Sequence, residues 1–474
     1  MHERSQRAIV AIALVAGLAL GGCASTPTAP PKLDLPTATD TDPNLERWWT
    51  AFNDTTLTAL VEEALANNLD LKAALARIEL AKAQVLLAQS AQFPTVDLDV
   101  NAYRSRATQV GSNPLPPGYS AYTTDYLVGL QASYEVDLWG KYRTTTAAAQ
   151  NDLLASEYGR ETVRTMVAAQ VAQTYFALLA ADAELIVLQD TLKTRDETVE
   201  LQRDRYQAGV IGDYDFVQAE AERAAVASDI ALAQRVDAQY ESALAVVLGR
   251  SPREVFDPRV TRDVETVRLL AVPTIPSGLP SNLLERRPDI KSVEKQLAAA
   301  NQRIDAARAD YFPSLSLTGE YGSEAGLLKN LFTGPAVIWS IAGALAQPLI
   351  GLQGIEANVL AKTANRDAVV VQYQQTVQGA FKDVHDALVA SETTRNALAA
   401  QTVRKNKLTQ ALELSNLRYT SGYSPYLEVL DTQRLLLQAQ TLQIFAARDV
   451  RLAAVDLAKA LGGGWQYKTA VAEK

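Results

Sequence analysis

The stretch "YTSGYSPYLEVLDTQR", residues 419–434, has a counterpart earlier in the chain, "YQAGVIGDYDFVQAEAER", residues 206–223. In both stretches a glycine follows a tyrosine by three residues and a segment with helical spacing comes next. Tyr206 and Tyr419 are 213 residues apart, as are Gly209 and Gly422. A sequence that recurs at a fixed offset predicts two structurally related halves.

The repeat continues upstream of both turns. Residues 67–100 align without a gap on residues 286–319, with Asp70 on Asp289 and Phe93-Pro94 on Phe312-Pro313, an offset of 219. The change of offset from 219 to 213 places six extra residues in the first half, between the FP motif and the turn. Each half therefore has the same order of segments and differs in one connection.

Alternating segments follow each FP motif. In residues 95–106 and 125–137, apolar residues alternate with Asp, Asn, Gln, Ser and Glu, and a loop rich in Pro, Gly and Ser (residues 111–120) separates the two. This pattern predicts a hairpin of two strands. A membrane barrel with a wet lumen and a half-buried hairpin of a soluble protein both show such alternation. A third strand is expected from residue 314, and a fourth, which alternates poorly, around residues 337–347.

Long proline-free segments follow the hairpins and favour the barrel. Residues 140–206 are 67 residues rich in Ala, Leu, Gln and Glu, enough for a helix about 100 Å long. A second helix of this kind is expected over residues 351–419, and each ends at a glycine turn that leads into a shorter helix. A compact globule has no use for helices of that length.

Four strands are too few to close a barrel. An open sheet edge in lipid leaves unpaired backbone groups, each of which costs several kcal/mol. If the strands enter a membrane, other copies of the chain must complete the wall, so the sequence predicts an oligomer.

The N-terminus reads as an export signal. Arg4 and Arg7 precede the apolar residues 8–20, which are too few to span a bilayer. The signal ends in "LGGC", whose Cys23 is the only cysteine, and this motif resembles a bacterial lipobox that leaves Cys23 as the lipidated first residue. The alternative is an ordinary signal peptide with an incidental cysteine. Residues 23–45 are expected to form a flexible tether.

Composition argues against several functions. The formal charge of −9 and the absence of a Lys/Arg run disfavour a nucleic-acid partner. With one cysteine and two histidines, the chain lacks the residues for a His/Cys metal cluster, and no metal or other cofactor is expected. The sequence has no GxxxxGK phosphate loop and no nucleophile paired with a histidine, so we do not expect an enzyme.

The chain resembles the TolC-like outer-membrane efflux proteins, specifically the NodT-type lipoproteins that serve resistance-nodulation-division pumps. The resemblance is carried by the lipobox and by four further segments: "RWWTAFNDTTLTALVEEALANNLDL" (47–71), "GLPSNLLERRPDIKSVEKQLAAANQRI" (278–304), "ADYFPSLSLTG" (309–319) and "RYTSGYSPYLEVLDTQR" (418–434). It implies a mixed, mainly α fold with two tandem repeats of helix, β-hairpin, long helix and helix. Three copies would form a 12-stranded membrane β-barrel continuous with a long periplasmic α-helical barrel.

The expected domain organisation follows from the repeat and the resemblance. It comprises a signal peptide (1–22), the lipidated tether (23–45), a first efflux repeat (46–249, hairpin about 95–137), a connection in an equatorial belt (250–280), a second repeat (281–464, hairpin about 314–348) and a tail (465–474). Trp48 and Trp49 are expected to be packing anchors. For Tyr103, Tyr119, Tyr122, Tyr126 and Tyr134, an aromatic girdle at the membrane interface and simple strand propensity remain equal alternatives.

The resemblance also assigns roles to the two turns. Gly209, Val210, Gly212, Gly422, Tyr423 and Ser424 would lie at the periplasmic tips that contact the adaptor. Leu427, Asp431 and Arg434 match the closing residues of the family, and they share one helix face, with Glu428 beside them. The first-repeat equivalents are Tyr214, Gln218 and Ala221, so gating charge is expected chiefly from the second repeat. The alternative is a solvated, salt-bridged helix face.

The expected function is the outer-membrane channel of a tripartite efflux system. The chain would give small toxic molecules a passive exit from an inner-membrane pump and a periplasmic adaptor. The alternative is a periplasmic adaptor or scaffold lipoprotein built on long helical hairpins.

Overall fold

A computed structural model describes residues 47–108, 110–111, 115–116, 118–258, 260 and 286–463. The predictions for the signal peptide, Cys23 and its tether, most of the connection at 250–280 and the C-terminal tail fall outside these residues. Within the described chain the helices are η1 (Trp48–Phe52), α2 (Thr55–Asn67), α3 (Leu69–Ser90), α4 (Lys141–Gln207), α5 (Asp213–Val247), α6 (Pro252–Phe256), α8 (Pro288–Ala309), η3 (Leu328–Asn330), η4 (Gly334–Ala336), α9 (Gln353–Thr420) and α10 (Tyr426–Ala460).

The chain divides into two compact units, and both take segments from each sequence repeat. Within the described chain, one unit contains Ala81–Leu153 and Lys295–Val371. The other unit contains residues 47–80, 154–294 and 372–463, apart from the undescribed connection. The sheet belongs to the first unit, and most of the helical mass belongs to the second.

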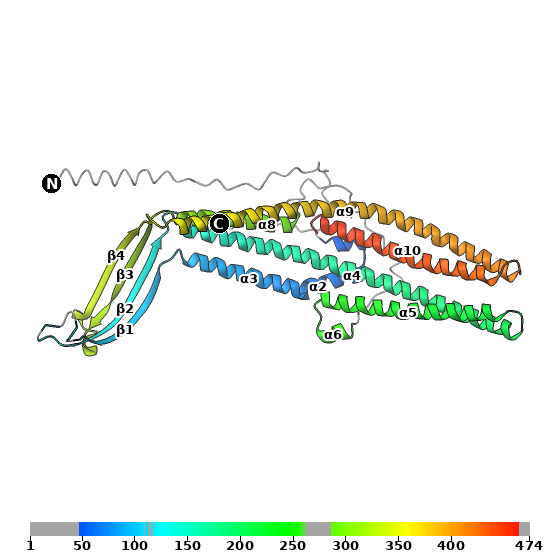
Figure 1. The fold of residues 1–474 in the computed structure, drawn as a ribbon, viewed down its shortest axis with the longest axis horizontal. Helices are drawn as coiled ribbons and strands as arrows, with labels where there is room; N and C mark the ends of the chain where they lie inside the picture. Colours follow the sequence, from blue (N-terminus) through cyan, green and yellow to red (C-terminus); the bar gives the residue numbers. More distant parts are fainter. Residues whose placement is uncertain are drawn as a thin grey trace. The chain divides into compact units, whose positions relative to one another are not determined.

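The sheet has four strands, β1 (Thr95–Arg106), β2 (Tyr122–Val136), β3 (Ser314–Ala325) and β4 (Val337–Ala346). They lie side by side in chain order, all antiparallel, with β1 and β4 at the edges (Figure 1). Because the order is open, the sheet is not closed on itself within one chain.

The register sorts the side chains of the sheet into an apolar and a polar face. One cross-strand row is Leu98, Leu130, Tyr321 and Trp339, and the neighbouring row is Asp97, Gln131, Glu320 and Ser340. Since adjacent residues of a strand point to opposite faces, the first row marks an apolar face and the second a polar one. The alternation seen in the sequence is therefore preserved across all four strands.

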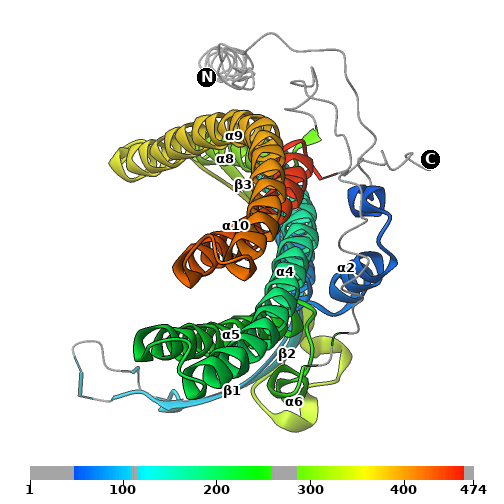
Figure 2. The same ribbon diagram turned by 90° about the vertical axis from the view of Figure 1, so that its right-hand side faces the viewer.

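The second unit is built on two helical pairs. α4 and α9 each continue for more than 60 residues, with 67 in α4 and 68 in α9, as their proline-free sequences predict. α5 lies beside α4, and α10 lies beside α9 (Figure 2). α2 and α3 are separated at Asn68, whose side-chain oxygen accepts from the backbone N–H of Asp70 and Leu71 and so caps α3.

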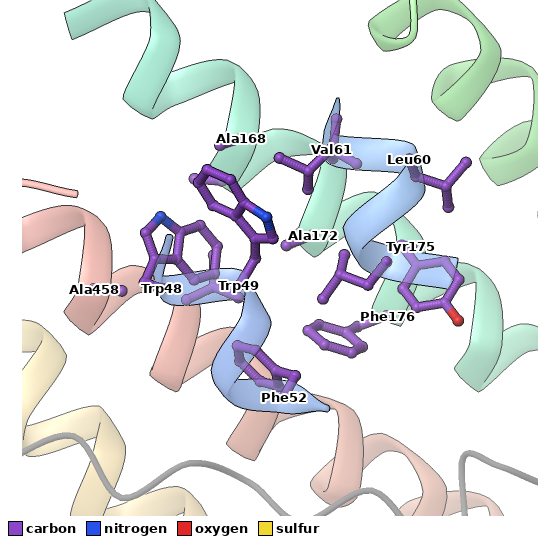
Figure 3. Packing of buried hydrophobic residues seen from close by; sticks show 14 of the residues in the cluster. Trp48, Trp49, Phe52, Leu60, Val61, Ala168, Ala172, Tyr175, Phe176 and Ala458 are labelled. Carbon is purple, nitrogen blue, oxygen red and sulfur yellow. The ribbon is translucent and has the colours of Figure 1, made fainter. Parts of the chain in front are cut away.

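A large hydrophobic cluster lies in this unit, where η1 and α2 pack against α4 and α10 (Figure 3). Trp48 and Trp49 are buried and meet edge to face with ring centroids 5.9 Å apart. Phe52 packs on Phe176 of α4 at 5.0 Å. The two tryptophans are packing anchors, as expected.

α4 is long and apolar enough to cross a membrane by length and composition. Residues 167–179, at the centre of that helix, nevertheless supply many of the cluster's buried side chains. The apolar stretch is thus part of the helical core.

One contact recurs at repeat-related positions. Asn68 Nδ2 donates to the carbonyl of Val247 at 2.8 Å, and Arg287 Nη1 donates to the carbonyl of Ala460 at 3.2 Å. The donors are related by the offset of 219 and the acceptors by the offset of 213. In both halves a side chain at the start of a helix therefore binds the last turn of another.

Candidate functional site

The two turns that the sequence repeats have the same backbone geometry. Gly209 and Gly422 have φ of 69° and 77°, in the left-handed region that favours glycine. Val210 N–H donates to the carbonyl of Arg205 at 2.9 Å, and Tyr423 N–H donates to that of Arg418 at 2.8 Å. Each long helix thus ends in a glycine cap, in which backbone N–H groups bind the last carbonyls of the helix and the chain turns.

The turns expose apolar side chains to solvent. Val210 is 71% exposed and Tyr423 is 82% exposed. Gly212 is the N-cap of α5, and Ser424 comes just before Pro425, the N-cap of α10. All six residues predicted for the tips therefore lie within these two turns.

The predicted gate residues lie in the first turns of α10. Leu427 is 49% exposed and Asp431 is exposed, while Glu428 forms an ion pair with Arg418 of α9 at 3.4 Å. Leu427 and Asp431 are therefore available to face a neighbour or a lumen.

Arg434 has a partner that the sequence reasoning missed. Its guanidinium binds Glu222 of α5, with Nε 3.0 Å from Oε1. Donation from Arg434 lowers the pKa of the Glu222 carboxyl and raises that of the guanidinium. Glu222 belongs to the first repeat and lies one residue beyond Ala221, the position that the offset selects, so Arg434 of the second repeat has a first-repeat carboxylate as its partner.

A second guanidinium approaches the same carboxylate. Arg195 of α4 is 2% exposed, donates to Gln433 Oε1 and has Nη2 4.0 Å from Glu222 Oε2. Burial lowers the pKa of this guanidinium, and the nearby Tyr426 and Glu222 partly oppose that effect. Glu222 is therefore shared by a buried and a half-exposed arginine.

Nearer the turns, two side chains of α4 contact Tyr419 of α9. Its hydroxyl accepts from Gln202 Nε2 at 3.3 Å and from Arg205, whose guanidinium carbon is 5.2 Å from the centre of the tyrosine ring. The tyrosine that begins the repeated stretch is thus a contact between the two helical pairs. No local pattern in the sequence predicts this contact.

Nothing in the described part of the chain groups three or more His, Cys, Asp or Glu side chains in a way that would hold a metal ion. His385 lies on an exposed face of α9, with Nδ1 3.3 Å from Asp386 Oδ1. The candidate site consists instead of charged and aromatic side chains that make contacts between helices.

The sequence matches the family described as Outer membrane efflux protein twice, over residues 60–250 and 279–463. It is 32% identical to a toluene efflux pump outer membrane protein, TtgC of Pseudomonas putida, over 99% of this chain and 98% of that protein. It is also 32% identical to the cation efflux system protein CusC of Escherichia coli, over 88% of each chain. These matches cover both halves of the chain.

Solved structures agree with the sequence relatives. The outer membrane channel CmeC of Campylobacter jejuni matches with a TM-score of 0.86 and 29% identity, over 92% of this chain and 95% of that one. The open state of the Neisseria gonorrhoeae MtrE channel matches with a TM-score of 0.76 and 29% identity, over 92% and 98%. These matches to outer-membrane channels contradict the alternative of a periplasmic adaptor or scaffold lipoprotein. The chain belongs to the outer membrane efflux protein family and is the outer-membrane component of an efflux system.

Proposed function

We propose that three copies of this chain form a passive duct with one 12-stranded barrel and a helical tunnel. The observation that carries this proposal is the open four-stranded sheet, whose edge strands β1 and β4 have no further partner among the described residues. In lipid such edges must be paired, and pairing β1 of one copy with β4 of the next satisfies both.

The two faces of the sheet support the same arrangement. Leu98, Trp339 and Ile341 on the apolar face are 67%, 72% and 82% exposed, as expected of side chains that meet lipid. Asp97 and Glu320 on the other face would line a wet lumen. A duct of this kind requires an energy source elsewhere, and we assign that role to an inner-membrane resistance-nodulation-division pump joined through a periplasmic adaptor.

The cargo is a small molecule whose identity the relatives leave open. Relatives with similar percentages of sequence identity to this chain are named for toluene, antibiotic, pyoverdine and cation efflux. We therefore propose only the class, small toxic or exported compounds.

The assembly is tested on full-length chain purified from outer membranes in mild detergent. We expect a heat-modifiable trimer on gels and a hollow particle with threefold symmetry by electron microscopy. A particle that stays monomeric, or that has no bore, would contradict the proposal. Mass spectrometry of the N-terminal peptide tests the accompanying proposal that Cys23 carries lipid.

We also propose that Leu427, Glu428, Asp431 and Arg434 close the tunnel at its periplasmic end. The ion pair of Arg434 with Glu222 supports this assignment, because it ties α10 to α5 close to the turns. In a trimer, three copies of Asp431 and Glu428 would put six carboxylates around one axis and favour cations.

Planar bilayer conductance tests the gate. Asp431→Ala and Arg434→Glu should each raise the conductance of the closed channel, since one removes axial charge and the other breaks the tie to Glu222. Glu220→Gln is the control, because Glu220 is exposed and lies two residues from Glu222 on α5. Unchanged closed channels in both gate variants would remove these residues from the gate.

The exposed turns suit a protein contact, and we assign the adaptor to them. Tyr423→Ser and Val210→Ser should weaken co-purification with the adaptor and leave the trimer intact. Equal adaptor recovery with the wild type and the double variant would contradict this assignment.

A further inference from the structure

Two arginines lie at the end of β1 on the same side of the sheet as its apolar residues. The β1–β2 ladder pairs every residue from Thr95 to Arg106 without interruption, so no bulge changes the alternation. Arg104 and Arg106 therefore share a face with Val96, Leu98 and Val100. They lie at the end of the strand away from its connection to α3.

Tyr122 of β2 lies next to both arginines. Each guanidinium carbon is 5.6 Å from the centre of the Tyr122 ring, and the tyrosine is 54% exposed. Both arginines are exposed as well. Among the ion pairs and side-chain hydrogen bonds found between described residues, none involves Arg104 or Arg106. The two positive charges are stacked on an aromatic ring and point to solvent.

The opposite face has the opposite charge at the same level of the sheet. Asp125 pairs with Tyr103 across the β1–β2 ladder, and Glu324 pairs with Leu127 across the β2–β3 ladder. Both carboxylates are on the polar face, to which Asp97, Asp99 and Glu320 also belong. At this end of the sheet, positive charge is confined to the apolar face and negative charge to the polar face.

We propose that Arg104, Arg106 and Tyr122 form a binding site for the phosphate-bearing headgroup of an outer-leaflet lipid. The proposal rests on the duct described above, in which the apolar face meets lipid and this end of the sheet is at the outer surface. A guanidinium matches phosphate oxygens with two parallel hydrogen bonds, which an ammonium cannot do. The apolar residues that precede the arginines on β1 are where the acyl chains of the same lipid would lie.

The side chains argue for this occupant over a soluble anion. Leu98 and Val100 are 67% and 66% exposed, so apolar surface continues directly from the arginines along the strand. A free phosphate would use the arginines alone, whereas an anionic lipid uses the arginines and the apolar surface together. Tyrosine is also a residue that outer-membrane barrels concentrate where hydrocarbon meets headgroups.

Binding of diphosphoryl lipid A to the purified full-length trimer, followed by native mass spectrometry, tests the site. We expect the double variant R104Q/R106Q to bind at least about tenfold more weakly than the wild type. The variant R104K/R106K should recover part of the affinity because the charge is kept. R404Q/K407Q, which removes two positive charges from α9, should bind as the wild type does.

Ligand comparisons on the wild type need no variant. Binding of lipid A from which both phosphates have been removed should be weaker, and millimolar inorganic phosphate should not compete at constant ionic strength. Equal binding of lipid A with and without its phosphates would mean that acyl contacts alone hold the lipid, and competition by free phosphate would identify a soluble anion site. Either result overturns the proposal.

Measurements on the trimer distinguish a failure of this inference from a failure of the proposed duct. If R104Q/R106Q lowers trimer stability in lipid-free detergent, the arginines bind a neighbouring subunit and the lipid site is wrong. If the wild-type chain forms no trimer, the duct is wrong whatever lipid binds. A stable trimer with equal lipid A binding in wild type and R104Q/R106Q contradicts this inference alone.

Discussion

Gly322 of β3 has no room for a side chain. A Cβ there would lie 2.5 Å from the carbonyl oxygen of Val128 and 2.6 Å from Cα of Gly129, its partner on β2. Gly322→Ala should therefore force β2 and β3 apart and cost about 1–3 kcal/mol. Urea unfolding of the reconstituted protein, followed by circular dichroism, measures the loss.

Gly319 supplies a matched control on the same strand. A Cβ at that position meets only the carbonyl oxygen of Ser340, at 3.8 Å, which is ordinary contact. Gly319→Ala should have the same midpoint of urea unfolding as the wild type. Equal midpoints for both variants would show that the strands relax freely at Gly322.

We predict that Glu222 determines how the proposed gate responds to pH. Donation from Arg434 lowers the pKa of the Glu222 carboxyl in the folded protein. If the proposed gate is closed when this ion pair forms, the pair should stabilise the closed form fully above the ordinary glutamate pKa of about 4.3, and this contribution should be lost only as the pH falls through the lower folded value. Conductance should stay low at pH 5 and rise under more acidic conditions.

Glu222→Gln should raise conductance at neutral pH and remove most of the acid response. The buried Arg195 then loses its carboxylate, so this variant should also be less stable than Glu220→Gln. An acid response that is unchanged in Glu222→Gln would assign it to other carboxylates, such as Asp431.

The contacts around Glu222 mark the limit of sequence reasoning at this scale. Leu427, Asp431 and Arg434 were predicted to share a helix face because their spacing is local. Arg195 and Glu222 contact residues more than 200 positions away. Neither a periodic pattern nor the repeat offset encodes such a pairing, because the offset relates equivalent positions and not partners.

At the scale of elements, glycines at helix ends fix how one helix meets another. Gly249 follows α5 with φ of 73°, and a Cβ there would come within 2.6 Å of the carbonyl carbon of Asn67 at the end of α2. Gly249→Ala should combine left-handed strain with a backbone clash and cost about 2–4 kcal/mol. The midpoint of urea unfolding measures it.

Gly351 separates the two contributions. It has φ of 81°, and a Cβ there would have nothing within 4 Å. Gly351→Ala should cost only the conformational strain, about 1–2 kcal/mol. Equal losses in the two variants would mean that α5 does not depend on its close approach to Asn67.

Element boundaries were predictable where a long pattern ends at Gly or Pro, and α4 differs from its expected range of 140–206 by one residue at each end. β4 was less clear because its residues are almost all apolar or small. Its register explains the pattern: Trp339, Ile341 and Leu345 share the apolar face, while Ser340, Ala342 and Ala344 share the other. The alternation is one of size, which a hydropathy reading does not detect.

At the scale of the whole molecule, the charges of the polar face predict ion selectivity. Asp97 and Glu320 are in one cross-strand row with Gln131, so three copies would place six carboxylates at one level of a lumen. Asp97→Asn with Glu320→Gln should reduce the preference for cations. Reversal potentials in a KCl gradient, measured in channels opened by Asp431→Ala, test this.

R104Q/R106Q is the control for selectivity, because these arginines are on the opposite face of the sheet. It should leave the reversal potential close to that of its parent. A larger shift in R104Q/R106Q than in the carboxylate variant would mean that the faces are assigned the wrong way round.

Family and localisation were predictable from the sequence because their motifs are local and extend over both halves. The side-chain pairs around Glu222 and the meeting of Gly249 with Asn67 were not, since both depend on how distant helices pack. The number of copies follows from neither source directly. The unpaired strand edges in lipid predict only an oligomer, and three copies are what the resemblance to the TolC-like proteins implies.

The unpaired edges of β1 and β4 have a genetic consequence. If every working channel needs three functional copies, a defective copy that still assembles inactivates each channel that contains it. With equal expression and random mixing, roughly one assembly in eight would contain only sound copies. Damaging alleles that preserve the edges should therefore be dominant, whereas alleles that abolish folding should be recessive.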